Sequence, residues 1–162
     1  MWGPPGTDAR LAGAYDLAPE PGMHEEFEFR LYPEHAFRFG PFTVEAFDVV
    51  HPVPAYSLRV TDPAGRVLAY SGDCGPCEGL ERAVAGADLM LAEAAFCDGD
   101  DNPEDLHLTG VEVGDLATRA GVGRLVLTHI PPWHEKQRAY DEARTRWDGQ
   151  LDLAEVGAVY EI

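Results

Sequence analysis

Three side chains that could bind a metal ion each follow an apolar stretch of the chain. His51 comes directly after TVEAFDVV, Asp73 comes after RVLAYSG, and His129 comes after RLVLT. If these stretches are neighbouring strands of one sheet, their ends meet at one edge, where α/β enzymes place their sites. Two imidazoles and a carboxylate suit Zn²⁺, Mn²⁺ or Fe²⁺. The repeated context predicts a metal site, although each histidine taken singly is more typical of a structural or surface residue.

The stretch SGDCGPCE around Asp73 leaves a second interpretation open. Cys74 and Cys77 have the CxxC spacing, but a four-thiolate zinc site needs a second pair and Cys97 stands alone. A redox-active pair would lie at the start of a helix, where the thiol pKa is lowered, and residues 79–87 could form such a helix. This redox hypothesis predicts a thiol of low pKa at Cys74.

The part of the chain before Asp73 has the alternating pattern of antiparallel strands. Strands are predicted for residues 26–33, 37–53, 56–62 and 66–73. A break is expected at Gly40-Pro41, and a hairpin turn at 62–65 joins the last two strands. The first 25 residues are rich in Gly and Pro and predict a loop with one short helix. The phenylalanines of this half have strand-like spacing and are expected in the core: Phe27, Phe29, Phe37, Phe39, Phe42 and Phe47.

After Asp73 the pattern changes to strands that alternate with helices. Continuous apolar runs predict buried strands at 87–96 and 123–130, and the tail 154–162 is expected to form a last strand. Helices are predicted for residues 79–87, 109–120 and 135–147. Gly121 is placed to end the second of these helices. The order predicts an α/β (α+β) fold in which helices cover one outer face of a sheet.

The composition of the chain limits the classes of function that are possible. Twelve Lys and Arg against 29 Asp and Glu give a formal net charge of −17, which disfavours broad nucleic-acid binding. Divalent cations or cationic partners fit this charge, and so does a simple solvated acidic surface. The 162 residues are 45% hydrophobic, which suits a single domain spanning 1–162. With no signal segment and no apolar run of about 18 residues, we expect a cytoplasmic protein without a membrane partner.

Five segments carry a resemblance to a known family. In order, they are HPVPAYSLRV, YSGDC, ADLMLAEAAF, HLTG and GVGRLVLTHI. Together they resemble the C-terminal half of the metallo-β-lactamase-fold hydrolases, most closely the branch of ribonuclease Z and related phosphodiesterases. The opening WGPPGT resembles the segment after the first helix of that fold, so the resemblance runs from Trp2 to about Ile130. It implies a partial αββα sandwich, mostly its C-terminal βα half.

The resemblance also implies roles for individual residues around a two-metal site, usually zinc, that activates a bridging water. His51 matches the third histidine of the first metal site, Asp73 the carboxylate that bridges both metals, and His129 the histidine of the second. His107 matches a histidine near the scissile phosphate, and Glu93 matches its acidic partner. Two cations about 3.5–4 Å apart can stabilise both oxygens of a phosphodiester displacement.

The chain departs from this family in two respects. The motif HxHxDH, which supplies further ligands upstream in the family, does not occur in these residues. We therefore expect this chain to supply part of the site, completed by a missing N-terminal half or by a homodimer; the alternative is a non-catalytic assembly or binding domain with a relict site. Only a short hairpin separates His51 from Asp73, where ribonuclease Z carries a tRNA-clamping arm. Together with the acidic charge, this difference argues against tRNA processing and leaves a small phosphodiester or ester as the expected substrate.

Overall fold

A computed structural model describes all residues from Met1 to Ile162. The chain divides into two compact units, Met1–Glu34 and His35–Ile162, and each is described by itself. The expectation of a single domain over 1–162 stays a prediction. None of the helices has both the length and the apolar character needed to span a bilayer.

The first unit is small and mostly irregular. Helix α1 (Thr7–Ala14) follows Gly6, and the short strands β1 (Trp2–Gly3) and β2 (Arg30–Leu31) pair in parallel. The expected short helix is confirmed. The strand predicted for 26–33 is wrong except at Arg30 and Leu31, because residues 26–29 and 32–33 have no strand partner and Phe27 is exposed.

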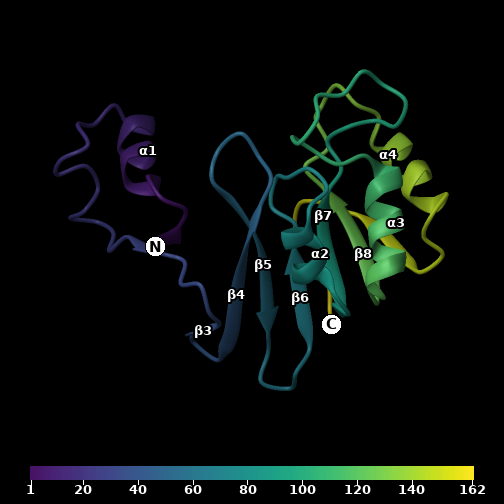
Figure 1. Ribbon diagram of the computed structural model, residues 1–162, viewed down its shortest axis with the longest axis horizontal. Coiled ribbons are helices and arrows are strands. Elements are labelled where there is room, and N and C mark those ends of the chain that lie inside the picture. Colours follow the sequence, from purple (N-terminus) through teal and green to yellow (C-terminus); the bar gives the residue numbers. More distant parts are fainter. The chain divides into compact units, whose positions relative to one another are not determined.

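The second unit contains one seven-stranded sheet (Figure 1). Its strands are β3 (Phe37–Phe39), β4 (Phe42–Val49), β5 (Ala55–Thr61), β6 (Val67–Tyr70), β7 (Leu89–Glu93), β8 (Arg124–Thr128) and β9 (Gln150–Leu153). The order in the sheet is the order along the chain. Strands β3 to β6 are antiparallel, and β6 to β9 are parallel. The predicted change from antiparallel strands to alternating strands and helices is therefore confirmed.

Three helices cover one face of this sheet: α2 (Glu78–Val84), α3 (Gly110–Ala120) and α4 (Lys136–Arg144). Helix α3 begins with a capping box, in which the Thr109 hydroxyl accepts from the Glu112 amide and the Glu112 carboxylate accepts from the Thr109 amide. It ends at Gly121, which has φ 67°. The predicted helix and its stop are both confirmed.

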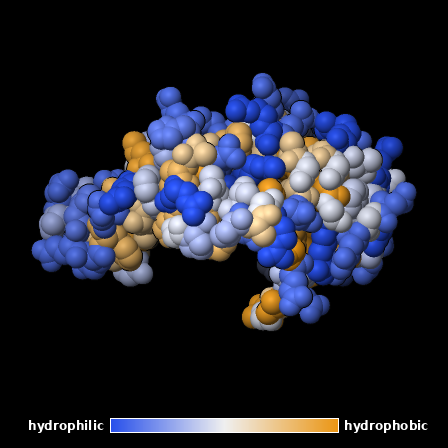
Figure 2. Space-filling model, turned by 90° about the horizontal axis from the view of Figure 1, so that it is seen from below, coloured by the Kyte–Doolittle hydropathy of each residue, from blue (hydrophilic) through white to orange (hydrophobic).

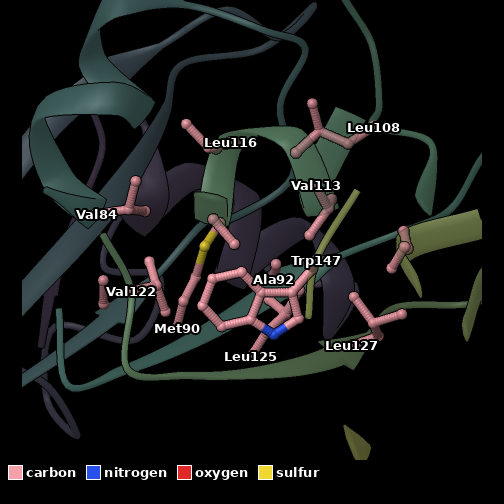
Figure 3. Close-up of a cluster of buried hydrophobic side chains, with 14 of the residues drawn as sticks. Val84, Met90, Ala92, Leu108, Val113, Leu116, Val122, Leu125, Leu127 and Trp147 are labelled. Atoms are coloured by element: carbon pink, nitrogen blue, oxygen red, sulfur yellow. The ribbon is translucent and has the colours of Figure 1, made fainter. Parts of the chain in front are cut away.

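The main core lies between the helices and the sheet. Alternate residues of the parallel strands point toward the helices, including Met90 of β7 and Leu125 of β8. Figure 3 shows Trp147 among these side chains, with Val113 of α3 above them. On the outer surface seen in Figure 2, hydrophilic side chains predominate, with smaller hydrophobic areas between them.

Two predictions for the second unit are wrong. The last strand is β9, and residues 154–162 form a turn at 156–157 within an irregular segment, because Gly157 has φ 83° and Val156 and Val159 are exposed. Phe39 and Phe42 were expected in the core but are 61% and 39% exposed. They lie at the hairpin between β3 and β4, at the edge of the sheet, where no helix covers them.

Helices α3 and α4 approach closely because α3 carries two glycines on one face. A Cβ at Gly114 would lie 2.5 Å from the Ala143 carbonyl oxygen. Glycine to alanine normally stabilises a helix interior by about 1 kcal/mol. For Gly114→Ala we expect the opposite, a loss of about 1–3 kcal/mol in the free energy of unfolding, because the interface becomes overpacked. Urea denaturation checks this, with Gly13→Ala in α1 as the control, where an added Cβ meets nothing.

Candidate metal centre

The strand directions bring the predicted site residues to one edge of the sheet. Strands β6, β7 and β8 are parallel, and β4 runs in the same direction because two antiparallel pairings separate it from β6. Glu93 is the last residue of β7, His129 directly follows β8, and Asp73 and His51 follow β6 and β4. The edge formed by the carboxyl ends of these strands therefore carries four chemically active side chains.

The side chains gather around the His107 ring. The His107 ring centroid lies 5.5 Å from that of His51 and 5.3 Å from that of His129. On the other side of His129, its Nδ1 lies 3.4 Å from Asp73 Oδ1. The side chains of Asp73 and His129 are 39% and 46% exposed, so both are open to solvent and to a ligand. The structure thus brings together all five residues singled out from the sequence, Glu93 included.

Glu93 is the buried centre of the group, with an exposure of 0%. Its Oε1 accepts hydrogen bonds from the Cys74 amide at 2.7 Å and from His107 Nδ1 at 2.9 Å. Its Oε2 accepts longer bonds from the amides of Ala95 and Leu108. Burial raises the pKa of Glu93 above the usual value for a glutamate, while the bonds from His107 and from the Cys74 amide act against the rise.

Two of the histidines are oriented by their Nδ1 atoms. His51 Nδ1 lies 3.0 Å from the Leu106 carbonyl oxygen, which can only accept, so this nitrogen carries the proton and Nε2 is left with a free lone pair. In His107 the bond to Glu93 holds the ring in the same way. A carbonyl or carboxylate behind a histidine is the usual arrangement around a metal ligand or a catalytic imidazole.

The turns that carry Asp73 and His129 have special backbone geometry. Gly72 has φ 67°, and a Cβ there would lie 2.6 Å from the Tyr56 carbonyl oxygen, so only glycine fits before Asp73. His129 has φ 53°, a conformation that residues other than glycine rarely adopt. Such backbone strain is concentrated at functional sites, where the surrounding structure holds it in place.

Comparison with known proteins identifies the family of this chain. Residues 1–130 match the model of the beta-lactamase superfamily domain. The chain is a member of the metallo-β-lactamase superfamily. Its fold is that of these hydrolases: the metallo-β-lactamase fold protein YhfI from Bacillus subtilis superimposes on 99% of this chain and 64% of its own, with a TM-score of 0.80 at 27% identity. The family predicted from the sequence is confirmed.

Two curated relatives extend the comparison. An uncharacterized protein of Mycobacterium tuberculosis is 36% identical over 167 residues, which is 100% of this chain and 60% of the relative. The "Ribonuclease Z" of Myxococcus xanthus is 35% identical over 102 residues, which is 60% of this chain and 33% of the relative. This superfamily member thus spans 60% of the length of its mycobacterial relative.

The metallo-β-lactamase superfamily uses divalent metals, and one group of side chains in this member has its ligand atoms close enough together to hold one. Glu93, His107 and His129 have ligand atoms within 4.8 Å of one another. However, Glu93 already accepts from four donors, whereas the carboxylate of Asp73 is open to solvent beside His129. The accessible carboxylate of Asp73 beside His129 is therefore better placed to accept a cation than Glu93, which serves to hold His107.

Cys74, directly after Asp73, does not fit redox chemistry. Cys74 is fully buried, and burial raises the pKa of its thiol, with a further increase from the nearby Glu93 charge. A redox-active thiol needs the opposite shift. The redox hypothesis for Cys74 is therefore wrong, and the thiol fills space behind the Asp73 turn.

Sequence reasoning missed the supporting groups of the site. The Leu106 carbonyl that orients His51 lies 55 residues away along the chain, and no local pattern indicates it. Ser71 lies in the SGD motif itself, and its buried hydroxyl accepts from the Glu93 amide. A serine in a motif of this kind was the only available signal.

Proposed function

We propose that this chain carries part of a dinuclear zinc site that hydrolyses phosphodiesters or related esters. The observation that supports this function is the meeting of His51, Asp73 and His129 at one sheet edge, directly beside a histidine held by a buried carboxylate. Zinc suits two imidazoles and a carboxylate, and Mn²⁺ or Fe²⁺ accept the same donors.

Each of the three ligands offers a suitable donor. His51 presents Nε2, because its Nδ1 is bonded to the Leu106 carbonyl. Asp73 would offer its two carboxylate oxygens as donors, and His129 lies next to it. Bound zinc ions lower the pKa of water to near neutrality and stabilise negative charge on phosphoryl oxygens.

His107 is placed to act on the leaving group. Its Nδ1 proton is held by Glu93, so its Nε2 can carry a second proton and donate it to the departing oxygen. The buried Glu93 carboxylate stabilises the imidazolium form and fixes the ring orientation. The Phe96 ring contacts His107 edge-on at 5.1 Å between centroids and restricts the ring further.

The surface of the chain favours a small substrate. A net charge of −17 repels long polyanions, and between β5 and β6 there is only a turn at Asp62–Gly65. The Myxococcus xanthus relative is named "Ribonuclease Z", and a ribonuclease cleaves phosphodiester bonds. This name supports phosphodiester hydrolysis as the reaction class. We therefore propose a small phosphodiester or ester.

The three ligands of this chain would hold two cations only with further donors. The family motif HxHxDH is absent from these 162 residues, so the additional ligands would come from an upstream segment of a longer chain or from a second copy. The alternative is a non-catalytic assembly domain, in which the same side chains have no metal to bind.

The function is tested by joining these residues to an upstream segment that carries HxHxDH. We expect about two zinc ions per chain by plasma mass spectrometry, and hydrolysis of bis(p-nitrophenyl) phosphate. His107→Gln is expected to lower kcat about 10²- to 10⁴-fold with unchanged zinc content, because only a proton donor is lost. His35→Gln, at an exposed position, is the control. Zinc-loaded protein without hydrolysis, or full activity in His107→Gln, would contradict the proposal.

A further inference from the structure

A buried hydroxyl joins the two strand ends that carry the site. Ser71 directly follows β6 and is 0% exposed. Its Oγ accepts a hydrogen bond from the Glu93 amide at 2.9 Å and donates to the Gly72 carbonyl at 2.7 Å. Its own amide donates to the Leu91 carbonyl of β7. Ser71 therefore connects the end of β6 to the end of β7 through its side chain and its backbone.

The residues on either side of Asp73 are bonded to the same partner. Upstream, the Ser71 hydroxyl holds the backbone of Glu93. Downstream, the amide of Cys74 donates to the Glu93 carboxylate at 2.7 Å. The turn that presents Asp73 is thus attached to Glu93 at both ends. Glu93 in turn holds His107. The position of Asp73 and the position of His107 are set by one residue.

Water cannot replace the Ser71 hydroxyl. Ser71, Glu93 and Cys74 are all 0% exposed, so the Glu93 amide would lose its acceptor without compensation. A second serine supports the same turn from the other side, since the Ser57 hydroxyl donates to the Ser71 carbonyl. Ser57 is also 0% exposed. No apolar side chain could make these contacts.

We infer that Ser71 is a positioning residue that couples the metal ligand Asp73 to the Glu93–His107 pair. The expected effect of Ser71 on metal binding rests on the proposed function. The proposed role of Ser71 is to fix Asp73 and the Glu93–His107 pair relative to each other. Ser71 itself contacts neither cation nor substrate. Its removal is expected to let the Asp73 turn and the end of β7 move independently.

The test compares Ser71→Ala with Val122→Ala in the chain as it stands. Val122 is 5% exposed and precedes β8 at the end opposite to His129, so its truncation weakens the same core without touching the site. We expect Ser71→Ala to weaken Zn²⁺ binding about 10- to 100-fold in a competition titration, the usual effect of losing a supporting partner of a ligand. Val122→Ala is expected to bind Zn²⁺ as the unchanged chain does.

A second readout needs no metal. Amide hydrogen exchange at Cys74 and Glu93 is expected to be at least about tenfold faster in Ser71→Ala than in Val122→Ala, when both are compared at equal distance from their melting temperatures. Unchanged exchange at both amides, or unchanged Zn²⁺ affinity in a chain that binds Zn²⁺, would overturn the inference.

The two proposals can fail separately. If the unchanged chain binds no Zn²⁺ but Ser71→Ala frees the two amides, the coupling stands and the metal site does not. If Ser71→Ala does not fold, Ser71→Cys replaces it, because the thiol fills the position and is only a weak acceptor.

Discussion

Asp73→Ala is expected to weaken zinc binding by at least about 100-fold. The reason is that Asp73 is the only solvent-accessible carboxylate beside His129, at 3.4 Å from its Nδ1, and the other carboxylate of the group is occupied by four donors. Removing a supporting partner of a ligand already costs about 10- to 100-fold, and a ligand itself contributes more. A competition titration with a chromophoric chelator measures the change.

Two further variants make this experiment specific. Asp73→Asn keeps the shape and removes the charge, so it separates the carboxylate's role as a ligand from its role in the turn. Asp101→Ala removes the same charge from an exposed loop and is expected to leave the affinity unchanged. Equal zinc affinity in Asp73→Ala and Asp101→Ala would show that the cation is bound elsewhere.

Glu93→Ala is expected to lower the free energy of unfolding by about 3–5 kcal/mol, the range seen when one partner of a buried charged pair is removed. Glu93 is 0% exposed, and its removal leaves the Cys74 amide, the Leu108 amide and His107 Nδ1 without their acceptor. Chemical denaturation measures the loss, provided that the m-value is unchanged.

Two control variants accompany Glu93→Ala. Glu93→Gln retains the volume and one acceptor oxygen, so its loss of stability is expected to be smaller. Glu104→Ala, in an exposed loop, is expected to change stability by less than about 0.5 kcal/mol. A loss below about 1 kcal/mol for Glu93→Ala would mean that other groups or water replace the carboxylate.

Sequence patterns predicted the elements whose signals are local. The helix at 109–120 has its cap at Thr109 and its stop at Gly121, and the structure has both. The strand expected for 154–162 failed because apolar residues alone do not make a strand: pairing with β8 goes to Gln150–Leu153, whose Leu151 reaches the core. The exposed Phe39 shows the same limitation, since its spacing is strand-like but no element covers it.

The site was predictable in part for a related reason. His51, Asp73 and His129 could be selected because each follows an apolar strand. Since these strands run in the same direction, their ends lie at the same edge of the sheet. The contacts that orient them are not visible in the sequence. The Leu106 carbonyl is a backbone group, and the left-handed conformation of His129 is set by tertiary packing, so neither has a residue-type signal.

The strand order of the sheet has a consequence for how the protein reaches its structure. Each strand of the second unit pairs with the next one along the chain, so the antiparallel hairpins of β3 to β6 close short stretches at low entropic cost, whereas the parallel pairs must close the longer crossovers that contain α2, α3 and α4. The sheet can therefore form stepwise, beginning with the antiparallel hairpins. The metal centre cannot form in this stepwise way, since its side chains come from the ends of β4, β6, β7 and β8. The candidate ligands acquire their places only when the strands from β4 to β8 are all paired, so we expect metal affinity to depend on the formation of this whole row.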